Sequence, residues 1–352
     1  MNPQRRFGSA RQELIERLFP RGIPRLWCPL LTHFDDAGAI DRDRTRAHLG
    51  FLRSSVDGLL IPGSTGEGWE MDAAETRAQL ECVLGAIAGT GMRLLIGVLK
   101  TELEAMRRTI ADTAAWLKRR SATDDALDGM TRAGVCGFTV CPPSGAGLTQ
   151  DQLRGALESV LALGLPTALY QLPQVTGNEM SAATVAALAD RFPNFYLLKD
   201  TSGRDAVAAS GLRSVFLVRG AEGEYASHLA DGGGAYDGFL LSTANGFGPE
   251  LARMIAHLEC GEGEAARALS ARLSALVEEV FAQAAGVPAG NAFTNANKAI
   301  DHFFAHGPGA ARLPAPRLHS GVRLPDELIA AAHGALIRHR MMPPRGYLEP
   351  AA

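Results

Sequence analysis

Short apolar runs alternate with longer amphipathic stretches along most of the chain. Glycine, proline or polar residues bound each apolar run, a pattern typical of strands buried on both faces. The expected strands cover residues 25–31, 58–61, 93–98, 137–141, 167–170, 195–198, 215–218 and 238–241. Helical spacing of apolar residues marks the stretches between them, at 41–54, 73–87, 102–119, 150–163, 181–191 and, more briefly, 221–231.

Eight strands that alternate with helices predict an α/β fold, specifically a TIM (β/α)8 barrel. A doubly wound open sheet is the competing architecture. Such a sheet often carries a glycine-rich dinucleotide turn after its first strand, but here that segment reads LTHFDDAGAID. The chain therefore divides into a helical extension, the barrel, an appended C-terminal helical segment and a tail rich in Pro and Arg, at residues 1–21, 22–246, 247–308 and 309–352.

The flanking segments have patterns of their own. Residues 9–19 predict an amphipathic helix that packs on the body of the protein or on a partner subunit. Residues 248–286 are helical in pattern, and a further helix is expected at 295–304. We expect the tail to be partly extended, with one helix at 325–338.

The amino-acid composition narrows the classes of function that the protein can have. The 352 residues carry a net charge of −3, with 46% hydrophobic and 21% charged residues, which argues against a disordered chain and a generally basic nucleic-acid binder. No apolar stretch has the length of a membrane span. The five cysteines form no CxxC pair, which favours buried thiols in a reducing cytoplasm. No HxH or HExxH motif predicts a metal site.

Lysine is scarce, so Lys199 stands out among the four lysines. It ends the apolar run 195–198, at the strand end where α/β barrels carry out chemistry. A lysine in a low-dielectric site has a lowered pKa, and its free amine can attack a carbonyl. Structural pairing with Asp200 is the competing interpretation.

Three other segments follow strands at the same barrel end. The turn Gly63–Gly68, GSTGEG, here called the cradle turn, offers backbone N–H groups and hydroxyls to a carboxylate or phosphate. Tyr170 ends the fifth strand, where a phenol can relay protons, although a core or rim tyrosine is the plainer interpretation. Residues 238–245 offer backbone groups after the eighth strand. Together these features suit Schiff-base chemistry on a 2-oxo acid, without a metal or cofactor.

Four ordered motifs carry a resemblance to a known family: GSTGEG at 63–68, YQLPQVTG at 170–177, LLKDTSG at 197–203 and DGFLLSTAN at 237–245. Over residues 22–305 the chain resembles the dihydrodipicolinate synthase / N-acetylneuraminate lyase family of class I aldolases. The resemblance implies a TIM barrel with a C-terminal helical segment. It also implies a homo-oligomer, either a homotetramer or a homodimer.

The resemblance assigns roles to individual residues. Lys199 matches the Schiff-base lysine and Tyr170 the proton-shuttling tyrosine. Ser64 would link Tyr170 into a proton relay, and Thr65 would hold the 2-oxo-acid carboxylate. Leu240 matches a position whose backbone carbonyl points into the site, whereas Gly63, Gly66 and Glu67 resemble structural members of the cradle turn.

Departures from the family pattern bear on the substrate. Val175 stands where the synthase has an arginine for its aldehyde substrate, which argues against a role in lysine biosynthesis. The segment 141–146 lacks the tyrosine that reaches a neighbouring subunit's site in many relatives, so the three-hydroxyl relay is incomplete. Gln171 replaces the common Asn.

The expected function is a Schiff-base lyase or aldolase that acts on pyruvate or another 2-oxo acid together with an aldehyde. A hydroxy-oxo acid or a 2-keto-3-deoxy sugar acid is the expected substrate class. Two alternatives stay open: an imine-dependent dehydratase of a sugar acid, and a non-catalytic 2-oxo-acid-binding regulatory protein on the same fold. No nucleic acid or membrane partner is expected.

Overall fold

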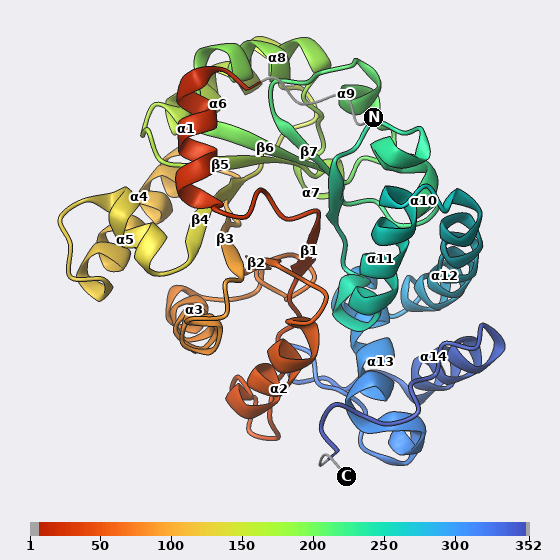
Figure 1. Ribbon diagram of the computed structural model, residues 1–352. Helices are drawn as coiled ribbons and strands as arrows, with labels where there is room; N and C mark the ends of the chain where they lie inside the picture. Colours follow the sequence, from red (N-terminus) through yellow and green to blue (C-terminus); the bar gives the residue numbers. More distant parts are fainter. Residues whose placement is uncertain (1–6, 350–352) are drawn as a thin grey trace.

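The computed structural model describes residues 7–349, which form a closed barrel of eight parallel strands in the order β1 to β8 (Figure 1). This architecture confirms the predicted TIM barrel. The strands are Leu26–Pro29, Gly58–Ile61, Arg93–Val98, Val135–Val140, Thr167–Gln171, Phe195–Asp200, Phe216–Arg219 and Gly238–Leu240.

The sixth strand is longer than the sequence pattern predicts. Lys199 pairs in register with Tyr170 on β5 and with Val218 on β7, and Asp200 continues the same ladder. The apolar run ends at Leu198, but hydrogen bonding continues because both neighbouring strands are long enough to pair. Lys199 therefore lies inside β6, near the carboxyl end, rather than just beyond the strand.

Helices of the barrel surround the strands in the predicted places. They are α2 (Arg42–Leu52), α3 (Ala73–Ile87), α4 (Leu103–Arg120), α6 (Gln150–Leu161) and α8 (Ala182–Arg191). Asp72 and Glu75 form a capping box on α3, and Ser181 caps α8. Both caps explain why these helices begin where the pattern places them.

Several short helices differ from expectation. The structure adds three helices that the apolar spacing does not signal: α5 (Ala126–Arg132), α7 (Pro173–Thr176) and α9 (Ala206–Ala209). Residues 221–231 contain only α10 (Tyr225–His228) and a 3-10 turn at Ala230–Gly232.

The predicted stretch 248–286 is two helices, α11 (Ala244–Glu259) and α12 (Gly263–Ala284), separated where Gly261 adopts a positive φ of 77°.

The N-terminal helix α1 (Ser9–Leu18) closes the amino end of the barrel (Figure 1). Ile15, Leu18 and Phe19 belong to the same buried apolar cluster as Trp27 and Tyr196 from the barrel interior. This confirms a helix that packs on the body of the protein. The part of the predicted extension before residue 7 lies outside the described residues.

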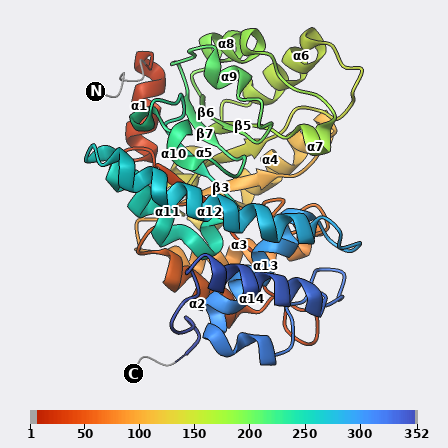
Figure 2. The same cartoon turned by 90° about the vertical axis from the view of Figure 1, so that its right-hand side faces the viewer.

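The C-terminal helices lie together along one side of the barrel (Figure 2). They comprise α11, α12, α13 (Ala292–His306) and α14 (Asp326–Arg338), with a 3-10 helix at Gly307–Arg312 between the last two. The expected tail helix is thus present. The irregular parts of the tail also pack on the body, because Leu318 and Leu324 are buried in the main core.

The structure bears on two expectations that the composition raised, one about the cysteines and one about membrane-spanning helices. All five cysteines are free thiols, but Cys260 is exposed at the end of α11, which corrects the expectation that all are buried. Within residues 7–349, no helix combines the length and the apolar character that crossing a membrane requires.

Candidate active site

Lys199 lies inside the barrel with only 4% of its surface exposed. Burial lowers the pKa of its ammonium to about 7 from the ordinary value of 10.5. Cys141, Glu222 and Cys28 act in the opposite direction but do not overcome burial. About half of the amine is therefore neutral near pH 7, the state required for attack on a carbonyl.

Tyr170 lies beside Lys199 on the neighbouring strand. The Lys199 Nζ atom is 4.1 Å from the centroid of the Tyr170 ring, and the two residues are register partners. Burial raises the pKa of the Tyr170 phenol above 10.0, whereas hydrogen bonds with the side chains of Thr201 and Ser64 lower it. The structure thus brings three predicted residues, Lys199, Tyr170 and Ser64, into one cluster.

The cradle turn follows β2 and is tightly folded. The backbone N–H groups of Gly66 and Gly68 both donate to the Gly63 carbonyl at 3.0 Å. A Cβ atom at Gly66 would lie 2.4 Å from the Leu30 carbonyl oxygen, so only glycine fits there. Gly63 and Gly66 are therefore structural members of the turn, and Thr65 is buried within it.

The C-terminal segment holds the cradle turn from outside. On α13, the Thr294 hydroxyl donates to the carbonyl oxygens of Ser64 and Thr65, at 3.2 and 3.0 Å. Glu67 forms a buried ion pair with Lys298, also on α13, and accepts a hydrogen bond from the backbone N–H of His319 at 2.7 Å. The appended helices and the tail therefore fix the position of this turn.

Leu240 contributes its side chain to the barrel interior, beside its register partner Trp27. This packing accounts for an apolar residue at that position. The role of its backbone carbonyl in the site stays a prediction.

Sequence reasoning missed Glu222, which follows β7 at the same barrel end. Its carboxylate accepts hydrogen bonds from the hydroxyls of Ser242 and Thr243, at 2.6 and 2.7 Å. Its charge also acts on Lys199, whose pKa it raises. Glu222 fits the rule that singled out Lys199, a polar residue near the carboxyl end of a strand, but solvated residues of the surface loops fit that rule too.

Trp69 is a second residue that the sequence did not single out. It follows the cradle turn directly, and its indole N–H donates to the Ser64 Oγ atom at 2.9 Å. Its ring packs against a small buried cluster of Cys141, Tyr170 and Leu172. Trp69 therefore contacts Ser64 and the buried cluster to which Tyr170 belongs.

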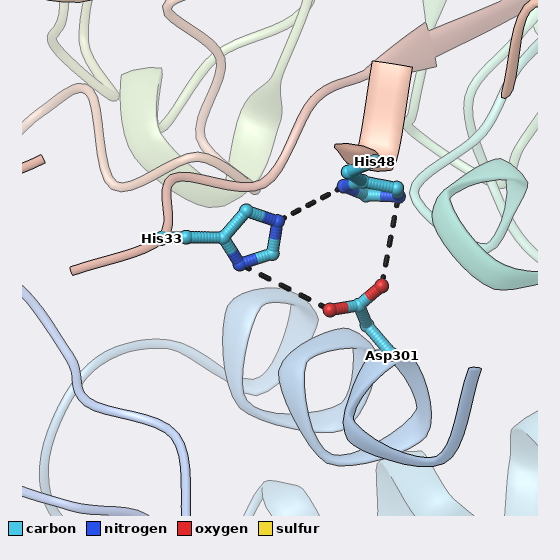
Figure 3. A group of neighbouring side chains, drawn as sticks. All are labelled: His33, His48 and Asp301. Atoms are coloured by element: carbon cyan, nitrogen blue, oxygen red, sulfur yellow. Dashed lines mark hydrogen bonds and ion pairs between the residues drawn. The ribbon is translucent and has the colours of Figure 1, made fainter. Parts of the chain in front are cut away.

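A separate buried cluster contains metal-ligand residue types: His33 after β1, His48 on α2 and Asp301 on α13 (Figure 3). The His33 Nε2 and His48 Nδ1 atoms are 3.0 Å apart, a hydrogen-bond distance. His48 Nε2 lies 2.8 Å from the Asn245 carbonyl oxygen. Burial is the main cause that lowers the pKa of both histidines.

The surroundings of Asp301 do not fit a metal ion. Arg44 pairs with one carboxylate oxygen at 3.0 Å, and the Tyr347 hydroxyl donates to the other at 3.0 Å. A cation there would face the guanidinium of Arg44 and would have to displace existing hydrogen bonds. We interpret this cluster as a structural network that attaches α13 and the tail to the barrel.

Proteins of known family share sequence with this chain. The sequence model of the Dihydrodipicolinate synthetase family matches residues 121–295. A 4-hydroxy-tetrahydrodipicolinate synthase of Xanthomonas axonopodis pv. citri is 35% identical over 250 residues, covering 70% of this chain and 76% of the relative. One from Dehalococcoides mccartyi is 28% identical over 275 residues, covering 76% and 84%.

Solved structures share the fold. A prophage protein of the dihydrodipicolinic acid synthase family from E. coli K12, in complex with pyruvate, aligns with a TM-score of 0.68 at 21% identity, covering 91% of this chain and 99% of the other. A 2-keto-3-deoxygluconate aldolase variant from Sulfolobus solfataricus aligns with a TM-score of 0.65 at 17% identity, with the same coverage. By its sequence, the chain belongs to the dihydrodipicolinate synthetase family of class I aldolases.

Proposed function

We propose that this protein is a Schiff-base lyase that cleaves or forms a carbon–carbon bond next to a 2-oxo acid, with pyruvate as the simplest such acid. The observation that carries the proposal is the buried Lys199 amine, which is partly neutral near pH 7 and lies against the Tyr170 ring. An amine in this state is a nucleophile, and a lysine kept for structure alone would be expected to remain charged and paired.

In the proposed reaction, the neutral Nζ atom of Lys199 attacks the C2 ketone carbon, and the resulting carbinolamine loses water to give a protonated imine. This imine accepts the electron pair of the bond that breaks at C3, which leaves an enamine and releases an aldehyde. Tyr170, coupled to Ser64, transfers the protons. Thr65 and the backbone N–H groups at the start of the cradle turn, including that of Gly63, bind the carboxylate, and the Leu240 carbonyl faces the substrate.

The second substrate differs from that of the synthase relatives in this proposal. Val175 lies on α7 with 41% of its surface exposed, and it offers no positive charge to a substrate carboxylate. A hydroxy-oxo acid or a 2-keto-3-deoxy sugar acid suits such a site better. A homotetramer or homodimer, a cytoplasmic location and the division of the chain after residues 21, 246 and 308 stay predictions.

A substrate screen tests the proposal. The protein is incubated with a panel of hydroxy-oxo acids and 2-keto-3-deoxy sugar acids, and the release of pyruvate is measured with lactate dehydrogenase. We expect pyruvate from at least one compound and none with the Lys199→Arg variant, since a guanidinium remains protonated. A dehydrated 2-oxo acid as product would indicate the dehydratase. Pyruvate binding with no turnover of any compound would indicate the regulatory protein.

A further inference from the structure

Trp69 is a hydrogen-bond partner of Ser64 to which the family resemblance assigns no role. Its Nε1–H donates to the Ser64 Oγ atom at 2.9 Å, and it packs against the small buried cluster that contains Tyr170 and Cys141. An indole nitrogen is a donor only and keeps its proton at neutral pH. The Ser64 oxygen thus accepts from Trp69, and its own proton must be donated elsewhere.

The remaining contacts give this network a single direction. Hydrogen bonds with the side chains of Thr201 and Ser64 lower the pKa of the Tyr170 phenol, which places both hydroxyls next to the Tyr170 oxygen. The Thr201 hydroxyl donates to the Gln171 carbonyl at 2.6 Å, so toward Tyr170 its oxygen is an acceptor. The hydrogen-bond chain therefore runs from the Trp69 N–H through Ser64, Tyr170 and Thr201 to a backbone carbonyl, with a donor-only group at one end and an acceptor-only group at the other.

We propose that Trp69 is a positioning residue that directs the Ser64 hydroxyl proton onto the Tyr170 oxygen and so stabilises the Tyr170 phenolate formed during catalysis. This inference rests on the proposed Schiff-base function. Charge-assisted hydrogen bonds are stronger than neutral ones, and a Ser64 hydroxyl that already accepts from Trp69 is a better donor. The indole N–H at one end of this series of hydrogen bonds cannot accept a proton, and the backbone carbonyl at the other end cannot donate one. The proton lost by Tyr170 therefore returns from the substrate.

The proton steps balance as follows. Tyr170 gives its proton to the hydroxyl that leaves the carbinolamine as water, which produces a protonated imine on Lys199 and a phenolate on Tyr170. The phenolate then takes a proton from C3 of the imine. The C3–H electron pair forms the C2–C3 double bond, and the C–N double-bond pair returns to nitrogen. Ser64 donates to the Tyr170 oxygen throughout the interval between these two transfers.

Pyruvate alone suffices to test this step. In D2O, the Tyr170 hydroxyl that has taken the C3 proton exchanges it for solvent deuterium while the enamine persists, and then delivers deuterium to C3. Loss of the pyruvate methyl signal in the proton NMR spectrum measures the rate. For Trp69→Phe we expect exchange at saturating pyruvate to be roughly tenfold slower, the effect of one hydrogen bond, with a KM within about twofold of wild type. Trp116→Phe, at a tryptophan that Arg77 covers, is the matched control and should exchange at the wild-type rate.

A double-mutant cycle separates positioning from packing. In a Ser64→Ala background, Trp69→Phe should have little further effect, because the acceptor of its hydrogen bond is gone. If Trp69→Phe fails to fold, 3-benzothienylalanine at position 69 replaces the N–H with sulfur at nearly the same size. An unchanged rate of deuterium exchange in the position-69 variants would overturn the inference. So would a loss of rate on Trp69→Phe that is equal in the wild-type and Ser64→Ala backgrounds. If the wild-type protein neither exchanges pyruvate protons nor forms an adduct that borohydride reduces, the proposed function itself fails.

Discussion

Lys199 and Tyr170 are register partners on β6 and β5, and the Lys199 Nζ atom lies 4.1 Å from the centre of the Tyr170 ring. The aromatic ring thus covers the amine on one side, and the barrel interior removes it from water. Because desolvation disfavours the charged form, this arrangement lowers the pKa of the Lys199 amine to about 7, as the proposed nucleophile requires. The following predictions rest on this pair and on the segments that hold the cradle turn.

Imine formation should depend on pH through the Lys199 amine. With a pKa of about 7, the neutral fraction falls about tenfold for each pH unit below that value. The initial rate of adduct formation with limiting pyruvate and cyanoborohydride, followed by intact mass, should therefore fall steeply between pH 7 and 5 and level off above pH 8. A rate that rises only above pH 9 would mean that the Lys199 pKa is not lowered.

Burial of Lys199 should reduce the stability of the fold. The lysine binds a proton less tightly in the folded state, so its penalty is complete below pH 7 and disappears above pH 10.5. At about 1.4 kcal/mol per pKa unit, Lys199→Met should stabilise the protein by a few kcal/mol at pH 7, and by less as the pH approaches 10. Urea unfolding at both pH values measures this difference. A variant less stable than wild type at pH 7 would contradict the expectation.

The buried ion pair between Lys298 and Glu67 should matter for both stability and pyruvate binding. Lys298→Met leaves the Glu67 carboxylate unpaired in a buried site, at a cost of roughly 3–5 kcal/mol. Because Glu67 belongs to the cradle turn, the KM for pyruvate in the deuterium-exchange assay should also rise. The double variant Lys298→Met with Glu67→Gln should unfold at a higher urea concentration than Lys298→Met alone. Equal midpoints would show that the unpaired charge is not the cause.

The network of His33, His48 and Asp301 should make the protein sensitive to acid. Both histidines have a lowered pKa in the folded state, so the unfolded chain binds protons that the folded chain does not. Stability should therefore be lost as the pH falls below about 6.5, by up to about 1.4 kcal/mol per unit for each histidine. Comparison of urea midpoints at pH 7.5 and 5.5 should show a smaller loss in a His33→Asn, His48→Gln variant. The same loss in both proteins would contradict this account.

The barrel and the position of Lys199 near the carboxyl end of β6 were predictable because each depends on local sequence. Short apolar runs bounded by glycine and proline gave the strands, and an isolated lysine at the end of one run gave Lys199. Glu222 obeys the same rule, but no apolar pattern distinguishes it from a solvated surface glutamate. Trp69 was not predictable, because its role depends on the direction of one N–H group toward Ser64.

The packing of the tail also lay beyond the sequence pattern. Its contacts join residues far apart in the chain, such as His319 with Glu67 and Tyr347 with Asp301. Proline and arginine are frequent in this region and favour an extended, solvated interpretation. Outside the predicted helix at 325–338, the buried side chains that attach the tail are too few to produce a periodic signal.

Reductive trapping of pyruvate on Lys199 tests the central claim most directly. The protein is incubated with pyruvate and borohydride, digested, and mapped by mass spectrometry. The account predicts one adduct of the mass expected for a reduced pyruvate imine, on the peptide that contains Lys199, and none on the Lys199→Arg variant. No adduct with pyruvate or any other 2-oxo acid, or an adduct on Lys100, Lys118 or Lys298 instead, would contradict it.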